Sequence, residues 1–489
     1  MRNNKTFWVA LLLFGSVGSA VSQPPDSLWS RTYGGDLYDE CRAILQTTDG
    51  GFLLAGQTSE LDSTPQIADC WLLKTDANGD CVWNHRIETT GLEHPYDLIP
   101  CYDGTFVVAG NDRASSAFAN DFWLLKVDSM GDTVWDRTYG GPGVDACEAV
   151  LQTPDSGFVL GGWTESFGAG GKDFWLVRTD SDGDSLWSRT FGGSWAEECH
   201  DIVLTSDGGY LLVGEVLDPV SSYDIWIVKT DTNGDSEWSR TYGGFHEEYC
   251  LSAAQSADGG YVLAGYFHSL YTANEDALII RTDADGDTLW TRMFPRPPEL
   301  QDWCEALCRM PDGSSVLAGC RGVNISDDYG GDFWLFKVSS AGDSVWSRVF
   351  DTGSVEWCFG LKPTADGGFV MVGTKQPTWP DLPDVWLVRI GPTSSVPAVS
   401  VPARLTLLTS YPNPFNSTTQ IAFMLPVTQR VSLRLYDVLG REVAVMMSEI
   451  QTAGKHEMMF DASGLPSGVY LCRLEAGRMM QTRKMVLIR

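Results

Sequence analysis

Residues 187–235 read WSRTFGGSWAEECHDIVLTSDGGYLLVGEVLDPVSSYDIWIVKTDTNGD. The tryptophan that opens this phrase recurs at intervals of 51 to 56 residues, at Trp29, Trp83, Trp135, Trp187, Trp238, Trp290 and Trp346. The fullest copies continue with Gly-Gly, an acidic residue and a cysteine, a DGG turn, an apolar run and an Asn-Gly or Asp-Gly turn. Seven copies of one such unit predict a repeat architecture.

Each copy divides into four short apolar segments that are separated by turn residues. In the fourth copy we expect strands at residues 187–191, 199–205, 210–213 and 224–230, joined in part by Asp-Gly and Asn-Gly hairpins. Four strands per copy in seven copies predict an all-β chain with a seven-bladed β-propeller, followed by a smaller β-sandwich.

The two ends of the array predict how the ring closes. The first copy begins with the Trp29 strand, whereas the last copy stops at DVWLVRI (384–390) with no following Trp strand. We therefore expect the Trp29 strand to complete the seventh blade, which removes an exposed sheet edge.

We interpret the charged residues that recur in every copy as structural residues of the repeat. An aspartate precedes the last apolar run of each copy and a lysine or arginine ends it, and we expect interblade packing and buried or half-buried ion pairs from them. The aspartates are Asp69, Asp121, Asp173, Asp224, Asp276, Asp332 and Asp384, and the cations are Lys74, Lys126, Arg178, Lys229, Arg281, Lys337 and Arg389.

The D-x-x-G-x-x-x-W phrase at residues 76–83, 180–187 and 283–290 resembles the tryptophan-docking repeat of quinoprotein-like propellers. The resemblance covers eight residues per copy and mostly indicates a tryptophan that packs between blades. A quinone site would also need axial ligands, and nothing in the sequence identifies them.

The composition of the chain limits the partners that it can bind, and its first residues indicate the compartment in which it works. The 489 residues carry 34 Lys+Arg against 64 Asp+Glu, a formal charge of −30, which opposes binding to nucleic acid or to anionic lipid. Arg2 and Lys5, the apolar stretch 7–17 and the small residues that follow predict a secretory signal peptide at 1–22. We expect no transmembrane segment in the mature chain.

Twelve cysteines in an exported chain suggest disulfides, but their spacing argues against a disulfide framework. One repeat position holds Cys41, Cys147, Cys199, Cys250, Cys304 and Cys358, with Pro95 in the second copy. Equivalent positions lie a whole repeat apart, so we expect small buried thiols. A Cys304–Cys320 pair across one hairpin stays open as an alternative.

The C-terminal part has a different composition from the repeats. We expect the propeller over 23–391, a Pro/Ser/Thr/Val linker over 392–405 and a tail of alternating strands over 406–489. The tail contains YPNPFNSTTQIAFMLP (411–426), VSLRLYDVLGREVAVM (431–446), GLPSGVYLCRLEAG (464–477) and RKMVLIR (483–489).

These four motifs, in this order, resemble the C-terminal sorting domain of the type IX secretion system. The resemblance implies an immunoglobulin-like sandwich, recognition by the export machinery and a secreted or cell-surface location. It places Asn413, Pro414, Tyr436, Asp437, Gly440, Gly468, Tyr470 and Lys484 at characteristic positions. An ordinary adhesive module is the alternative interpretation of the tail.

Two sets of carboxylates are candidate ligand sites. Two residues before the cysteine position every copy has a carboxylate: Asp39, Glu93, Asp145, Glu197, Glu248, Asp302 and Glu356. If the cysteine strand is innermost, they would ring one mouth of the channel and bind a cation or a ligand with hydroxyls or amines. The alternative is that each carboxylate caps backbone N–H groups of the neighbouring blade.

The second set lies in the turns DSDGD and DADGD, namely Asp180, Asp182, Asp184, Asp283, Asp285 and Asp287. These turns look like calcium loops but lack the glutamate spacing of an EF-hand, and a hairpin turn explains them. Calcium is the one cofactor that they suggest. His200, beside Asp201 and close to Glu197 and Glu198, is the sole asymmetric polar cluster, and we interpret it as part of an exposed loop.

The sequence contains no GxSxG, HExxH, Walker or dinucleotide motif. We therefore predict a non-catalytic binding or adhesion protein with a glycan or protein ligand. An extracellular carbohydrate-active enzyme on the same scaffold, or a quinoprotein-like scaffold, is the alternative. The longest insertions, 59–68, 294–302 and 320–331, are modest, which favours binding over catalysis.

Overall fold

The computed structural model describes residues 24–35, 37–60, 67–87, 91–114, 120–218, 222–271, 274–294, 300–324, 331–376, 382–392, 406–411, 413–425, 429–451, 454–476 and 479–488. The predicted signal peptide lies outside the described residues, as do linker residues 393–405 and parts of the three insertions.

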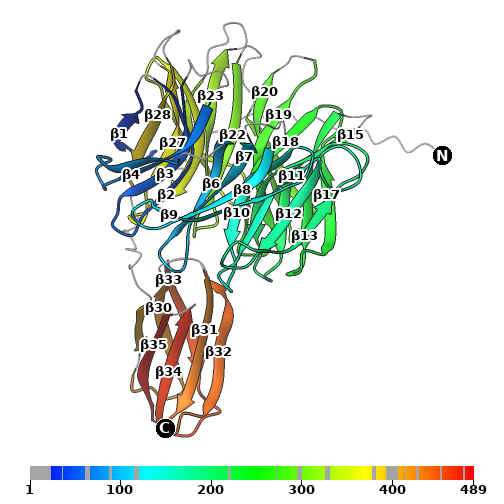
Figure 1. Cartoon of the computed structure of the whole chain (residues 1–489). Helices are drawn as coiled ribbons and strands as arrows, with labels where there is room; N and C mark the ends of the chain where they lie inside the picture. The colour runs from blue at the N-terminus through cyan, green and yellow to red at the C-terminus, as the bar shows by residue number, and fades with distance from the viewer. Residues whose placement is uncertain are drawn as a thin grey trace, which may run out of the picture.

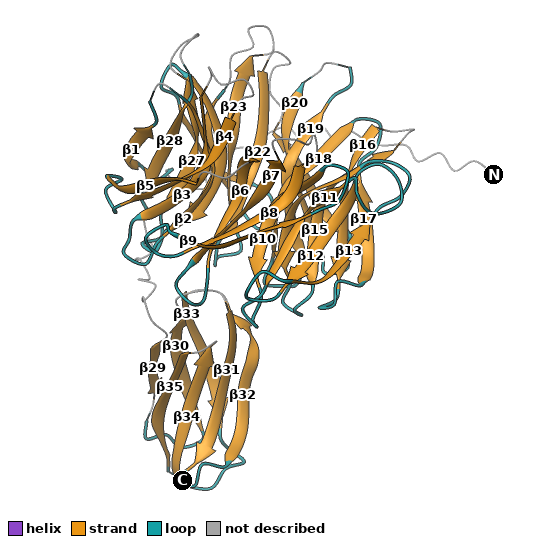
Figure 2. Ribbon diagram, in the orientation of Figure 1, coloured by secondary structure: helices purple, strands orange, loops and turns teal. Residues whose placement is uncertain are grey.

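The described chain is built from strands alone, and seven four-stranded sheets stand around a common axis (Figures 1 and 2). In each sheet the strands follow one another from the innermost to the outermost, and every pair is antiparallel. The predicted seven-bladed propeller is confirmed.

The innermost strands contain the cysteine position, as the sequence suggests. They are β2 (Tyr38–Gln46), β6 (Gly91–Pro100), β10 (Asp145–Gln152), β14 (Glu197–Leu204), β18 (Glu247–Gln255), β22 (Leu300–Arg309) and β26 (Val355–Pro363). The second strands are β3 (Phe52–Glu60), β7 (Phe106–Ala114), β11 (Phe158–Thr164), β15 (Tyr210–Asp218), β19 (Tyr261–His268), β23 (Ser315–Asn324) and β27 (Phe369–Gln376).

The third strands are β4 (Ile67–Thr75), β8 (Asn120–Val127), β12 (Asp173–Thr179), β16 (Ser222–Thr230), β20 (Glu275–Thr282), β24 (Asp332–Val338) and β28 (Asp384–Ile390). The outermost strands contain the repeated tryptophans and are β5 (Cys81–Ile87), β9 (Thr133–Tyr139), β13 (Ser185–Phe191), β17 (Ser236–Tyr242), β21 (Thr288–Phe294), β25 (Ser344–Phe350) and β1 (Ser27–Tyr33). We number the blades 1 to 7 from β2 to β26.

The N-terminal strand closes the ring. β1 pairs with β28 in antiparallel register from Ser27 opposite Ile390 to Tyr33 opposite Val385, so the seventh blade joins the two ends of the array. The Trp29 ring meets Phe52 of blade 1 edge-on at 5.8 Å between ring centres. The predicted closure is confirmed.

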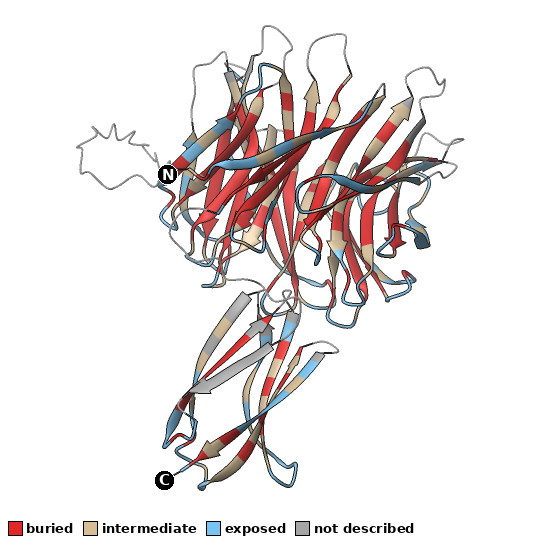
Figure 3. Cartoon of the chain, turned by 90° about the vertical axis from the view of Figure 1, so that its left-hand side faces the viewer, coloured by how far each residue is buried: buried red, intermediate tan, exposed pale blue. Residues whose placement is uncertain are grey.

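The hydrophobic core of the propeller lies between neighbouring blades, and Figure 3 shows buried residues along its strands. Seven buried clusters each combine the facing sides of two neighbouring sheets, and the cluster that spans the closure joins Ile44 and Phe52 to Val370 and Leu387. Eleven of the twelve cysteines are buried and all are free thiols, so the cysteines pack as small apolar residues.

The cation that ends each third strand pairs within its own blade. Its partner is the aspartate of the turn between the first and second strands, at 2.5 to 2.9 Å in all seven blades. In blade 1 the pair is Lys74 with Asp49, and the Lys74 ammonium also donates to the Thr75 carbonyl. Ion pairs were expected here, but the aspartate at the start of the third strand is not the partner.

The repeated tryptophans contact the next blade. A side chain at Gly79, which has a φ of 80°, would collide with the Trp29 ring, and the Tyr33 hydroxyl donates to the Gly79 carbonyl at 2.6 Å. Equivalent glycines meet the tryptophans of the other outermost strands up to Trp290. The tryptophan-docking phrase therefore describes interblade packing.

The smaller domain consists of two sheets that pack around one core. One sheet contains β29 (Thr406–Tyr411), β30 (Thr418–Leu425) and β33 (Gly454–Asp461), and the other contains β32 (Glu442–Gln451), β31 (Gln429–Asp437), β34 (Gly468–Ala476) and β35 (Met479–Leu487). The alternating residues Val431, Leu433 and Leu435 are buried, as predicted.

Removing residues 24–33 is expected to lower the free energy of unfolding by several kcal/mol. β28 would lose its partner strand, and burial of one large side chain such as Trp29 is alone worth about 2 kcal/mol. Urea denaturation of the mature chain measures the effect. Leu28→Ala, at a side chain that is 57% exposed, is the control and should change stability by less than about 0.5 kcal/mol. An unchanged urea midpoint in the deletion would contradict closure by β1.

Candidate functional site

Every innermost strand has a β-bulge immediately after the cysteine position. In blade 1, Cys41 is opposite Gly56 and Ala43 is opposite Ala55, so Arg42 is the extra residue. The other six blades shift register at the same place. We call these seven residues the bulge ring: Arg42, Tyr96, Glu148, His200, Leu251, Glu305 and Phe359.

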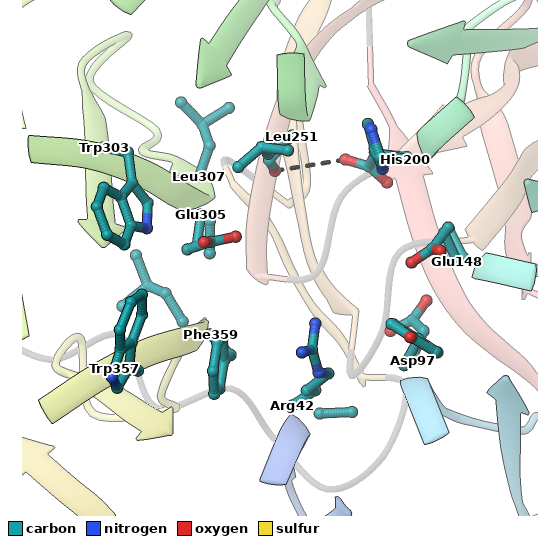
Figure 4. A pocket seen from close by; sticks show the side chains of 18 of the residues that line it. Arg42, Asp97, Glu148, His200, Leu251, Trp303, Glu305, Leu307, Trp357 and Phe359 are labelled. Atoms are coloured by element: carbon teal, nitrogen blue, oxygen red, sulfur yellow. Dashed lines mark hydrogen bonds between the residues drawn. The ribbon is translucent and has the colours of Figure 1, made fainter. Parts of the chain in front are cut away.

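The bulges place side chains in the central channel. Side chains of a regular strand point to the two faces of its sheet, and in a propeller these faces are the blade interfaces. A regular innermost strand would therefore present mainly backbone to the axis, and a bulge re-aims one side chain. All seven bulge residues line one cavity of about 820 Å³, with six of them labelled in Figure 4.

Arg42 is held rigidly on one side of the channel. Its guanidinium carbon lies 5.1 Å from the centre of the Tyr96 ring and 4.7 Å from that of Phe359. Its Nε donates to the Glu40 carboxylate at 2.5 Å. The positive charge of Arg42 is thus already paired inside the protein.

His200 is paired in the same way. Its Nε2 lies 2.9 Å from the buried carboxylate of Glu215. Burial opposes the charge of His200, but Glu215, aided by Glu148 and Glu198, outweighs burial and raises the pKa to about 9. The expectation of an exposed loop is wrong, because His200 lies on β14 and points into the channel.

Glu148 and Glu305 belong to blades 3 and 6, and Figure 4 shows them on opposite sides of the channel with their carboxylates toward its centre. Burial raises the pKa of Glu148 to about 7, although His200 and Arg42 lower it in part. Burial also raises the pKa of Glu305. The positive charges of Arg42 and His200 and a hydrogen bond from Trp303 oppose this rise.

Two further channel aspartates bind the blades together. Asp97 accepts the Val150 N–H at 3.0 Å, and Asp201 accepts the Ala253 N–H at 2.9 Å. Each carboxylate therefore satisfies a backbone donor of the innermost strand of the next blade. Their role is to fix the ring geometry.

Aromatic rings form much of the remaining channel wall. Trp303 and Trp357, one residue before the cysteines of blades 6 and 7, lie 5.4 Å apart between ring centres. Tyr266, Tyr96 and Phe359 also line the cavity. The channel thus combines carboxylates with ring faces.

The seven repeated carboxylates do begin the innermost strands, but none of them lines the cavity. Six are buried, and they hold the Gly-Gly connection from the preceding blade: the N–H of Gly35 donates to Asp39, that of Gly141 to Asp145 and that of Gly193 to Glu197. This geometry matches the alternative interpretation, in which each carboxylate caps backbone N–H groups of the neighbouring blade.

Several of these carboxylates face the aspartate that starts the third strand of the preceding blade. Burial and the nearby Asp224 raise the pKa of Glu248 to about 7. Burial also raises the pKa of Glu356 to about 7, with Asp332 adding to the effect and Thr352 donating a hydrogen bond that opposes it. These are like-charge pairs whose members share the space between blades.

The two calcium-like turns are closed by their own backbone. The Asp180 carboxylate accepts the N–H groups of Asp182 and Asp184, and Asp283 does the same for Asp285 and Asp287. Across the described ranges, no three His, Cys, Asp or Glu side chains come together as a metal site would require. Calcium at these turns gains no support.

The face at which the innermost strands begin also carries exposed aromatic residues; we call it the mouth face. Phe245 and Tyr271 stack with ring centres 6.0 Å apart, and they are 63% and 76% exposed. The His246 ring meets Tyr271 edge-on at 5.4 Å. Two connections, β17 to β18 and β19 to β20, thus form an aromatic patch near blades 4 and 5.

The characteristic residues of the tail have structural roles in the sandwich. The Asn413 side chain donates to the Lys484 carbonyl and accepts the Val486 N–H, which ties the start of the domain to β35. Asp437 closes the turn that contains Gly440, and the Tyr470 hydroxyl donates to the Pro466 carbonyl. Tyr436 lies in β31, Gly468 begins β34, and Pro414 lies between β29 and β30.

Comparison with known families identifies the tail. Residues 409–488 match the family described as "Secretion system C-terminal sorting domain". The predicted type IX sorting domain is confirmed, and the chain is exported by that system to the cell surface or beyond it. In the part of the chain that the structure describes, no helix is long and apolar enough to cross a membrane.

The chain is also similar to a curated protein at low identity. The regulatory protein FlaEY of Caulobacter vibrioides is 22% identical over 230 residues, which cover 40% of this chain and 24% of that protein. This chain thus spans about a quarter of that relative's length.

Solved structures with a similar fold include the polysaccharide lyase Uly1, at 8% identity and a TM-score of 0.47, over 72% of this chain and 89% of that one. The β-propeller domain of the Trilobed protease from Pyrococcus furiosus is 11% identical with a TM-score of 0.41, over 72% and 93% of the two chains.

The like-charge pairs predict that stability falls as the pH rises from 5 to 8. Each raised pKa means that the folded chain binds more protons than the unfolded chain between pH about 4.5 and about 7, so the free energy of unfolding decreases across this window. For the fully buried Glu356 the effect is on the order of 3 kcal/mol.

Urea denaturation of Glu356→Gln between pH 5 and 8 measures this effect. The variant should have a flatter pH dependence and higher stability than the natural chain at pH 8. Asp182→Asn, on an exposed turn, should behave like the natural chain. Equal slopes in Glu356→Gln and in the natural chain would refute the assignment.

Removing residues 406–489 is expected to leave the propeller in the periplasm, because the export machinery recognises the tail. Cell fractionation with an antibody against the propeller measures the distribution. A cooperative thermal melt of the retained protein would show that it is folded. Release of the truncated chain in normal amounts would contradict the sorting function.

Proposed function

We propose that this chain is an exported, non-catalytic binding protein that holds its ligand in the central channel, at the bulge ring. One observation carries the proposal. The bulge position is the same in every blade, yet it contains Arg, Tyr, Glu, His, Leu, Glu and Phe. The scaffold positions, in contrast, repeat their aspartate and their cation in all seven blades.

This contrast separates scaffold from site. A residue that serves folding is repeated because each blade has the same structural need. Side chains that differ from blade to blade give an asymmetric surface, and an asymmetric surface can select one ligand and one orientation. A cavity of about 820 Å³ with both charged and aromatic walls is suited to a small molecule or to part of a larger one.

The two basic groups of the bulge ring, Arg42 and His200, are engaged in structural pairs, which favours binding over catalysis. His200 is paired with Glu215 and not with a hydroxyl or a thiol. Burial raises the pKa of the neighbouring Cys199 thiol well above its usual range, so no thiolate is available there.

The mouth face is accessible in the exported protein. The third strands run away from this face, so the chain leaves blade 7 at Ile390 on the opposite side of the ring. The sorting domain therefore follows from the face without the aromatic patch (Figure 1).

A second candidate function is adhesion through the mouth face. The stacked and exposed Phe245 and Tyr271 rings favour contact with a glycan or with a protein surface. The two functions are compatible, because the patch lies near the start of innermost strands that line the channel.

A thermal-shift screen tests the channel proposal. The full mature chain is mixed with neutral oligosaccharides, amino acids, polyamines and short peptides, each at millimolar concentration. We expect one class to raise the melting temperature, because a ligand at a hundred times its Kd adds about 2.7 kcal/mol to the stability. The rise should be lost in Phe359→Ala and Leu251→Arg and kept in Phe245→Ala.

Other outcomes contradict the proposal in distinct ways. Stabilisation that survives both ring variants but is lost in Phe245→Ala would assign binding to the aromatic patch. Breakdown products of an oligosaccharide would favour the carbohydrate-active enzyme. A panel with no effect would leave the channel without a ligand of these classes and would refute the proposal.

A further inference from the structure

The charge balance of the channel suggests which class of ligand it accepts. Its lining includes five carboxylates, from Asp97, Glu148, Asp201, Glu275 and Glu305, against the cations Arg42 and Lys362 and the histidine His200. The whole chain has a formal charge of −30. An anionic ligand would meet a repulsive field in this channel.

Most of the charged groups that line the channel already have a partner in the protein. Arg42 is neutralised by Glu40 and His200 by Glu215, and neither of these two carboxylates belongs to the five. Asp97 and Asp201 accept backbone N–H groups. Glu275 lies 3.3 Å from the His268 ring nitrogen. Glu148 and Glu305 therefore remain as the two carboxylates of the bulge ring that form no ion pair with a described residue, although Arg42 and His200 lie near enough to lower the pKa of both.

The walls beside these two glutamates are aromatic. Trp303 lies two residues before Glu305, and its ring is 5.4 Å from that of Trp357. Tyr96 lies on the blade next to that of Glu148. Ring faces attract cations, including ammonium and guanidinium groups, through the quadrupole of the ring. A metal ion would instead need several oxygen ligands around one point.

We propose that the channel binds an organic cation, an ammonium or guanidinium group, between the Glu148 and Glu305 carboxylates and against the aromatic wall. This inference rests on the proposed function of the bulge ring. The cation can come from a free amine or from a lysine or arginine side chain of a peptide. Both sources present the same charged group to the two glutamates.

Isothermal titration calorimetry on the full mature chain tests the inference with three probes. They are spermidine, the peptide Gly-Lys-Gly with both termini blocked, and the same blocked peptide with an acetylated lysine. We expect at least one charged probe to bind and the acetylated peptide to bind at least about tenfold more weakly, because acetylation removes the charge. Binding of spermidine alone would indicate a free amine, and equal or tighter binding of Gly-Lys-Gly a peptide.

Two variants test the positions of the charges. Glu148→Gln and Glu305→Gln keep the side-chain size and should each weaken binding by about tenfold, which is ~1.4 kcal/mol. Asp182→Asn removes one carboxylate from an exposed turn and should have no effect on the titration. Thermal melts of the three variants establish that each is folded.

The pH dependence gives an independent readout. Glu148 is faced by His200 and Glu198 of β14, by Arg42 of β2 and by Glu215 of β15, and its pKa is about 7. Protons compete with the ligand below this pKa, so binding should weaken by about tenfold from pH 8 to pH 6. The loss should be much smaller in Glu148→Gln.

The outcomes separate this inference from the proposed function. If neutral sugars bind, depend on Phe359 and do not respond to Glu148→Gln, the channel is a binding site but not one for cations. If Ca²⁺ binds and none of the organic cations does, the site is one for an inorganic ion. If neither a cation nor a neutral compound binds, both proposals fail.

Discussion

The pairing of β1 with β28 is the constraint on which the rest of the structure depends. An open array would leave an unpaired strand edge at each end, and no blade can bury both of its apolar faces without two neighbours. The strand from Ser27 to Tyr33 closes the circle and completes the seventh interblade core. Only a closed circle has a central channel with seven innermost strands facing each other.

The ring separates positions that support folding from positions that are free to serve a ligand. The intrablade ion pairs, the tryptophan contacts with the next blade and the capping carboxylates recur around the circle. The bulge residues share no common structural partner. They line the central channel, where the scaffold does not require one residue type. Arg42 and His200 are anchored there by Glu40 and Glu215, so these two side chains of the ring are held in place without a ligand.

Most of the fold could be predicted from the sequence, because strand count, turn residues and closure are properties of the repeat itself. The sorting domain could be recognised because its motifs are local and ordered. The channel site could not be found in this way, since a bulge at Arg42 or His200 leaves no mark in the alternation of apolar residues. The same difficulty explains Glu197 and its equivalents: their strand position was predicted, but whether a side chain faces the axis or the neighbouring blade depends on the blade angle.

A crystal structure of the mature chain soaked with the blocked Gly-Lys-Gly peptide would test the central claim most directly. The bulge ring as a cation site predicts density in the channel, with the lysine ammonium within hydrogen-bond distance of the Glu148 or Glu305 carboxylate and beside the aromatic wall. Density only on the Phe245 and Tyr271 patch, or an empty channel at a concentration that saturates binding in solution, would contradict it.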